Sequence, residues 1–79
     1  MAQHVKADRA YRYVIAELVR RRKAAGVTQV KLAAALKTDQ SQVSKYERLE
    51  RELGLIDFVR YCRAIRTDAA DLVRLVERA

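Results

Sequence analysis

Apolar side chains recur at intervals of three and four residues along most of this chain, and no proline interrupts the pattern. That spacing places the side chains on one face of an α-helix, whereas a β-strand would need strict alternation. Asp8 is a suitable N-cap and Gly26 a suitable stop, so we expect the first helix between them. Its apolar positions are Tyr11, Val14, Ile15, Leu18 and Val19.

Two short helices are expected in the middle of the chain. Thr28 can cap the first, which meets a weak stop near Thr38, and Asp39 can cap the second, over about residues 40–48. A close crossing of two helices needs a small side chain in the first of them, and Ala33 can supply it. The other inward-facing positions of this pair are Leu32, Leu36, Val43 and Tyr46.

Two more helices follow a charged stretch, residues 49–54, which we expect to be a loop. The first has Leu55, Phe58, Val59, Cys62 and Ile65 at helical spacing, and Asp68 can cap the second, over residues 69–78. Only two glycines occur in 79 residues, a composition that favours helices. The sequence predicts one all-α domain over residues 1–79, with residues 1–7 as a flexible N-terminal arm that carries His4.

The charge balance indicates a polyanionic partner. Lys and Arg number 17 against 10 Asp and Glu, which gives a formal net charge of +7. Nucleic acid is the first candidate. A membrane is disfavoured because no run approaches the ~20 apolar residues that span a bilayer, and no signal peptide opens the chain. We therefore expect a cytoplasmic protein.

Residues suited to catalysis or metal binding are scarce. The single cysteine, Cys62, and the single histidine, His4, cannot fill the four positions of a zinc site, so we expect no metal and no cofactor. A Ser-His-Asp set and a Gly-rich phosphate loop are also missing, which argues against an enzyme. Cys62 is expected in the core. So are Tyr11, Tyr46 and Tyr61, whereas Tyr13 falls beside its apolar stripe.

The outward face of the segment 40–48 has no acidic residue. Gln40 can pair bidentately with an adenine edge, and Ser41 can donate to or accept from several bases. Lys45 lies one turn deeper on the same face. Base readout and a merely solvated surface stay equally open for Gln42 and Ser44, and Arg48 fits a phosphate contact or simple surface charge.

The segments Thr28-Gln29, Leu32-Ala33, Leu36, Gln40-Ser41 and 43–48 together resemble the phage repressor and Cro family of helix-turn-helix regulators, also called the xenobiotic-response-element (XRE) type. The resemblance covers Leu18 to about Val73. It implies a five-helix, lambda-repressor-like fold with the helix-turn-helix at helices 2 and 3. It also implies a transcriptional regulator that binds double-stranded DNA, with a repressor as the expected kind. It also implies that Gln29 holds a phosphate and that Arg22 and Glu47 form a structural ion pair.

Three positions depart from the family. Glycine is common near Lys37, Leu49 and Arg66, each of which follows a helix. A left-handed backbone costs a residue other than glycine roughly 1 kcal/mol. These helix ends are therefore expected either to accept strain or to close differently.

The last helix has more apolar surface than one core contact requires. We expect the surplus residues Leu72, Leu75 and Val76 to form the interface of a homodimer that reads a roughly palindromic operator, and the family often dimerises through this region. The alternative is a protein-interaction module, such as an antitoxin or anti-activator, on the same fold. The two functions can coexist.

Overall fold

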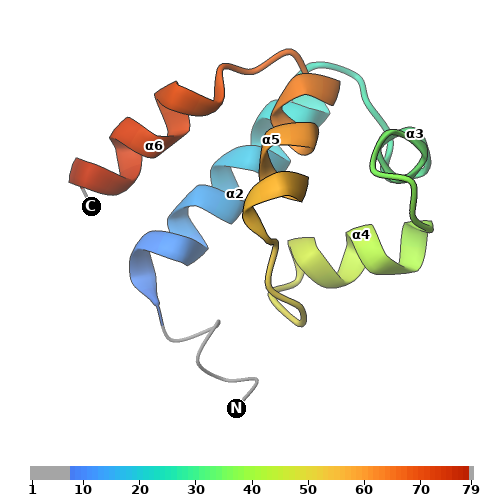
Figure 1. The fold of residues 1–79 in the computed structure, drawn as a ribbon, viewed down its shortest axis with the longest axis horizontal. Coiled ribbons are helices and arrows are strands. Elements are labelled where there is room, and N and C mark those ends of the chain that lie inside the picture. Colours follow the sequence, from blue (N-terminus) through green and yellow to red (C-terminus); the bar gives the residue numbers. More distant parts are fainter. Residues whose placement is uncertain (1–7, 79) are drawn as a thin grey trace.

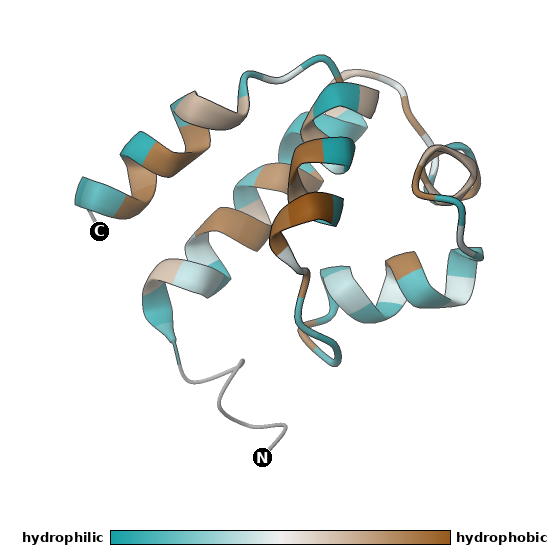
Figure 2. Ribbon diagram, viewed as in Figure 1, coloured by the Kyte–Doolittle hydropathy of each residue, from teal (hydrophilic) through white to brown (hydrophobic). Residues whose placement is uncertain are grey.

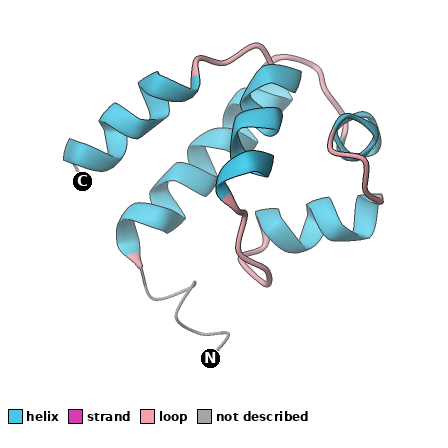
Figure 3. Cartoon of the chain, viewed as in Figure 1, coloured by secondary structure: helices cyan, strands magenta, loops and turns pink. Residues whose placement is uncertain are grey.

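The structure, a computed structural model, describes residues 8–78, and every regular element in that range is an α-helix (Figures 1 and 3). The all-α fold with five helices is therefore confirmed. The expected N-terminal arm, with His4, lies outside the described residues. The helices are α2 (Arg9–Ala24), α3 (Gln29–Ala35), α4 (Gln40–Glu47), α5 (Leu55–Ala64) and α6 (Ala69–Arg78).

Side chains predicted to cap helices do so at four N-termini, including that of α6, where Asp68 Oδ1 accepts from the Ala70 amide at 3.1 Å. Asp8 Oδ1 accepts from the Tyr11 amide at 2.9 Å at the start of α2. Thr28 Oγ1 accepts from the backbone of α3 at 3.1 Å, and Asp39 Oδ1 from that of α4 at 2.9 Å. Each cap satisfies an amide that the first turn of a helix leaves without a partner, so these starts are fixed locally.

The three positions that lack the family's glycine accept the left-handed conformation. Lys37, Leu49 and Arg66 have φ values of 57°, 65° and 59°. At each position the next residue's amide bonds back to a carbonyl in the last helical turn, which is the Schellman closure. The bonds join Thr38 N to Ala33 O at 2.9 Å, Glu50 N to Lys45 O at 2.8 Å, and Thr67 N to Cys62 O at 2.8 Å.

The core lies where the helices meet. α3 packs against α4 and α5, while α2 packs against α4 and α6. Ala33 is buried between helices, as a close crossing requires, and Cys62 is buried as expected. Figure 2 shows the hydrophobic segments of α2, α5 and α6 on neighbouring ribbons. The largest fully buried side chains are Tyr61, Leu18, Leu32, Leu72, Val43 and Cys62.

Leu72 was wrongly expected on a dimer surface. It has 0% exposure within the single chain, so it packs in the core and has no surface to offer a partner. Leu75 is half-buried, and Val73 and Val76 are 49% and 42% exposed. The surplus apolar surface of α6 therefore exists, but it is displaced from Leu72 toward these residues.

The charged stretch before α5 is a loop, as expected, but one of its residues is buried. Leu53 is buried although it lies in the charged stretch, and its amide donates to the Tyr11 hydroxyl at 2.8 Å. Tyr11 is half-buried, so it lies at the edge of the core rather than inside it. Tyr13 is exposed. The contact with Tyr11 ties the loop to the start of α2.

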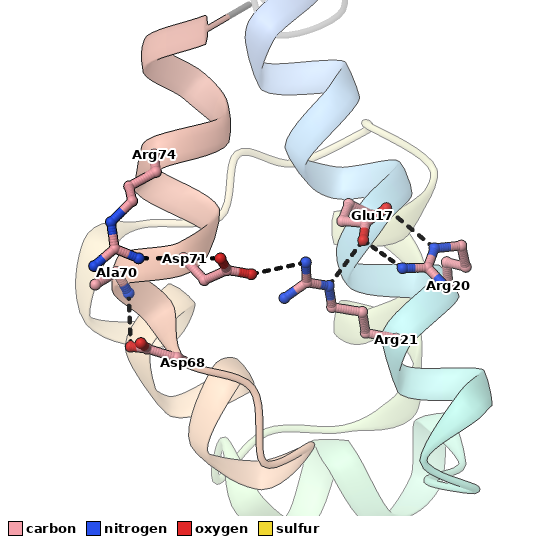
Figure 4. Close-up of polar contacts among 7 residues, drawn as sticks. All are labelled: Glu17, Arg20, Arg21, Asp68, Ala70, Asp71 and Arg74. Atoms are coloured by element: carbon pink, nitrogen blue, oxygen red, sulfur yellow. Dashed lines mark hydrogen bonds and ion pairs between the residues drawn. The ribbon is translucent and has the colours of Figure 1, made fainter.

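Charged residues fasten α6 to α2 (Figure 4). Arg21 lies between Glu17 on its own helix, at 2.8 Å, and Asp71 of α6, at 2.9 Å. Glu17 also accepts from Arg20. Hydrogen bonds from Arg20 and Arg21 lower the pKa of Glu17 to about 2, so the carboxylate stays charged at neutral pH. The basic run at the end of α2 therefore helps to hold α6 against α2, in addition to contributing positive charge.

Candidate nucleic-acid interface

α3 and α4 are joined by a short turn and cross at a steep angle, so that Figure 1 shows α3 almost end-on above α4. Val43 and Tyr46 of α4 are buried against the rest of the chain. The opposite face carries the polar side chains predicted as base-reading candidates. Gln40, Ser41 and Arg48 are exposed, and Gln42, Ser44 and Lys45 are half-buried.

A buried ion pair holds the end of α4 against α2. Arg22 donates to both carboxylate oxygens of Glu47, from Nε at 2.7 Å and from Nη2 at 2.8 Å. The two side chains are only 8% and 7% exposed. Arg22 also donates to the Val27 carbonyl at 2.9 Å. A bidentate pair of this kind fixes the direction as well as the distance between its partners, so α4 is set at a defined angle to α2.

Tyr61 of α5 completes the surroundings of Glu47. Its hydroxyl donates to Glu47 Oε2 at 2.6 Å. Burial alone would raise the pKa of Glu47, but hydrogen bonds from Arg22, Tyr61 and Gln29 outweigh it and hold that pKa below its ordinary value. Burial, together with the neighbouring carboxylate, raises the pKa of Tyr61. At neutral pH Glu47 is a carboxylate and Tyr61 is a donor.

A chain of side-chain amides runs from Glu47 to the exposed start of α4. Gln29 Nε2 donates to Glu47 Oε1 at 2.9 Å, and Gln29 Oε1 accepts from Gln40 Nε2 at 3.2 Å. We call Glu47, Gln29 and Gln40 the amide relay. It connects a buried carboxylate to the exposed side chain of Gln40, and it places the first residues of α3 and α4 side by side.

Gln42 is also anchored. Its amide donates to the Tyr46 hydroxyl at 3.3 Å, and that hydroxyl donates to Asp57 of α5 at 3.2 Å. No motif indicated the contact of Asp57 with Tyr46 or that of Tyr61 with Glu47. A general signal was present, however, because buried tyrosine hydroxyls usually find a partner.

The region that contains α3 and α4 matches a known family. Residues 18–72 match the family model described as helix-turn-helix, which is more than half of the chain. This chain belongs to the XRE-type helix-turn-helix family. The family implies that the ligand is double-stranded DNA, bound by a regulator.

A solved structure agrees with that assignment. It is described as an XRE-family like protein from Pseudomonas syringae pv. tomato str. DC3000, and it superposes on this helix-turn-helix protein with a TM-score of 0.81. The two sequences are 43% identical, and the match covers 87% of this chain and 84% of the other. A search of the curated proteins finds no match.

The described part of the helix-turn-helix protein offers neither a membrane span nor a cluster of metal ligands. No helix within residues 8–78 has the length and apolar character to cross a bilayer. In the same residues, no three His, Cys, Asp or Glu side chains form a group that could hold a metal ion. Burial raises the pKa of the Cys62 thiol to about 11, which keeps it protonated at neutral pH.

Proposed function

We propose that this protein is a sequence-specific transcriptional regulator, acting as a repressor in the cytoplasm, whose helix α4 enters the major groove of an operator. One observation carries the proposal. The outward face of α4 is uncharged-polar and basic, while its inner face is fixed by the pair between Arg22 and Glu47 at 2.7 Å. A rigid helix with polar residues at its front is what base readout in the major groove needs.

The residues of this face take different roles in the proposal. Gln40, Ser41 and Lys45 contact base edges, with Ser44 behind them, and Gln42 supports the start of the helix through Tyr46. Gln29 and Arg48 contact phosphates. Phosphate contacts set the position of a protein on DNA, whereas base contacts specify the sequence. Loss of Arg48 should therefore weaken binding to all duplexes alike.

A homodimer is the second part of the proposal. One eight-residue helix reaches only a few base pairs, so two copies about 34 Å apart on a roughly palindromic site would give useful specificity. An apolar groove of about 300 Å³ between α2, α5 and α6 supports a contact at Val76, whereas Leu75 lines a second hollow, between α2 and α6. The apolar lining of the groove includes Tyr11, Leu55, Phe58, Val73 and Val76.

Selection of bound duplexes from a random DNA library tests this function. We expect an enriched site with two-fold symmetry and half-sites about one helical turn apart, which would return the operator and its spacing together. An asymmetric half-site would remove the dimer and leave base readout intact. Failure to enrich any sequence, with retained binding to random DNA, would contradict sequence-specific regulation.

A protein-interaction module remains the second candidate function. The exposed side chains Leu55, Val73 and Val76 favour it, because they would suit an apolar partner as well as a second copy. Footprinting on the protein's own promoter separates the two functions. Protection by the purified protein alone favours the regulator, and protection only with an added partner favours the module.

A further inference from the structure

We propose that the hollow between the start of α2 and the end of α6 binds an acidic segment of a partner protein, with an apolar side chain of that segment at its centre. The hollow measures about 1080 Å³ and is open to solvent. We call the side chains that line it and carry the argument the arginine hollow: Arg9, Arg12, Tyr13, Leu75 and Arg78. The inference is independent of DNA readout by α4.

The arginines of the hollow have no acidic partner in the described part of the chain. Among residues 8–78, neither Arg9, Arg12 nor Arg78 forms an ion pair with a carboxylate. By contrast, the arginines drawn in Figure 4, which come from the same two helices, are each paired with a carboxylate. Asp8 also lines the hollow, but its Oδ1 already accepts from the Tyr11 amide as the cap of α2.

This grouping of like charges weakens the fold rather than supporting it. Arg9 and Arg12 are three residues apart on α2, so their charges are neighbours on one face of the helix, where like charges are destabilising. The packing of α6 against α2 brings Arg78 to the same hollow. A bound carboxylate would relieve the repulsion, so binding accounts for an arrangement that folding alone does not require.

The side chains between the arginines indicate which kind of anion fits. Tyr13 is 50% exposed and Leu75 is half-buried, so the hollow has apolar surface to cover as well as charges to pair. Guanidinium groups match carboxylates with two parallel hydrogen bonds. The hollow also exceeds the roughly 300–1,000 Å³ of most small-molecule sites, which favours a length of polypeptide. Carboxylates on both sides of an apolar residue satisfy these features together.

Two other occupants fit less well. A second copy of this chain has no acidic segment to offer, because no two of its 10 Asp and Glu residues are adjacent and its net charge is +7. A DNA backbone would leave the apolar part of the hollow uncovered. Figure 1 also shows α6 on the opposite side of α2 and α5 from α3 and α4, so the hollow is separate from the candidate nucleic-acid interface.

Selection of short random peptides displayed on phage, with the immobilised full chain as the target, tests the proposal. We expect the enriched peptides to carry acidic residues on both sides of an apolar residue. Arg12→Glu should lower their affinity at least about tenfold, because a charge pair becomes a like-charge contact, and Arg78→Glu should do the same from α6. Arg63→Glu is the matched control. It makes the same charge change at an exposed position of α5 and should lower the affinity much less.

The peptide and a DNA duplex separate the remaining explanations. Serine in place of the apolar residue of an enriched peptide should weaken binding, and equal affinity would overturn the proposal by showing attraction through net charge alone. Absence of enrichment, or enriched peptides that bind Arg12→Glu and Arg63→Glu equally, would also overturn it. Affinity for random duplex DNA should fall equally in these two variants. A selective loss in Arg12→Glu would assign the hollow to DNA phosphates instead.

Discussion

The pair between Arg22 and Glu47 shows how one contact joins stability to function in this protein. It ties α2 to α4 in a nearly dry site, and Tyr61 and Gln29 satisfy the remaining lone pairs of the carboxylate. A buried pair adds little net stability compared with apolar residues of similar size, but removing one partner leaves an uncompensated charge. Its principal contribution is therefore the fixed position of α4.

A double-mutant cycle measures the energetic coupling between Arg22 and Glu47. We expect Arg22→Met alone to reduce the free energy of unfolding by about 3–5 kcal/mol, because Glu47 then stays buried without its cation. The double variant Arg22→Met/Glu47→Leu should lose less than the sum of the two single variants. Urea denaturation gives the energies. Strict additivity would mean that the two residues act independently.

The resemblance implied the ion pair, but the remaining partners of Glu47 could not be predicted from the sequence. Tyr61 lies on an apolar stripe and was assigned only to the core, and nothing local reports that its hydroxyl reaches another helix. The contact of Gln29 with Gln40 joins residues from two helices, so it depends on their crossing angle. Such partners follow from tertiary packing rather than from spacing.

At the scale of helices, starts were easier to predict than ends. Asp8, Thr28 and Asp39 precede apolar series at helical spacing, and each accepts the capping bond that its position indicated. The ends at Lys37, Leu49 and Arg66 cannot be decided from the sequence, because a closing hydrogen bond and a left-handed strain of roughly 1 kcal/mol nearly balance. The structure shows that the closing bond prevails there.

Glycine substitutions at these ends should raise stability. Lys37→Gly and Arg66→Gly relieve φ values of 57° and 59° on exposed residues, and we expect each to add about 0.5–1 kcal/mol to the free energy of unfolding. Gly26→Ala is the reciprocal control. Its φ is +74° and an added Cβ would meet nothing within 4 Å, so backbone strain alone should cost about 1 kcal/mol. A loss of stability in both glycine variants would refute the strain.

At the scale of the whole molecule, the core was largely predictable and its outer limit was not. Leu72, Val73 and Val76 are all apolar on one short helix, and periodicity does not say which of them meets α2. Packing brings Leu72 fully inside and leaves Val73 and Val76 exposed. The proposed dimer surface had to be corrected for this reason, although the surplus itself was visible in the sequence.

The exposed apolar residues of α6 predict a homodimer. Light scattering at tens of micromolar should give about twice the chain mass of 9.1 kDa. Val76→Glu should return the mass of one chain, because a charge would be buried without a partner. Ala70→Glu adds the same charge at another exposed position of α6 and should leave the mass unchanged. A wild-type protein of single-chain mass, both free and on DNA, would exclude the dimer.

The most direct test of sequence-specific DNA binding is the ratio of affinities for the selected operator and for a scrambled duplex of the same composition. It should be measured at two salt concentrations, because phosphate contacts weaken both complexes as salt rises. We expect wild type to prefer the operator by at least about 10³, and Gln40→Ala to reduce that preference about tenfold without a change in melting temperature. A wild-type ratio near one would contradict sequence-specific DNA binding by this protein.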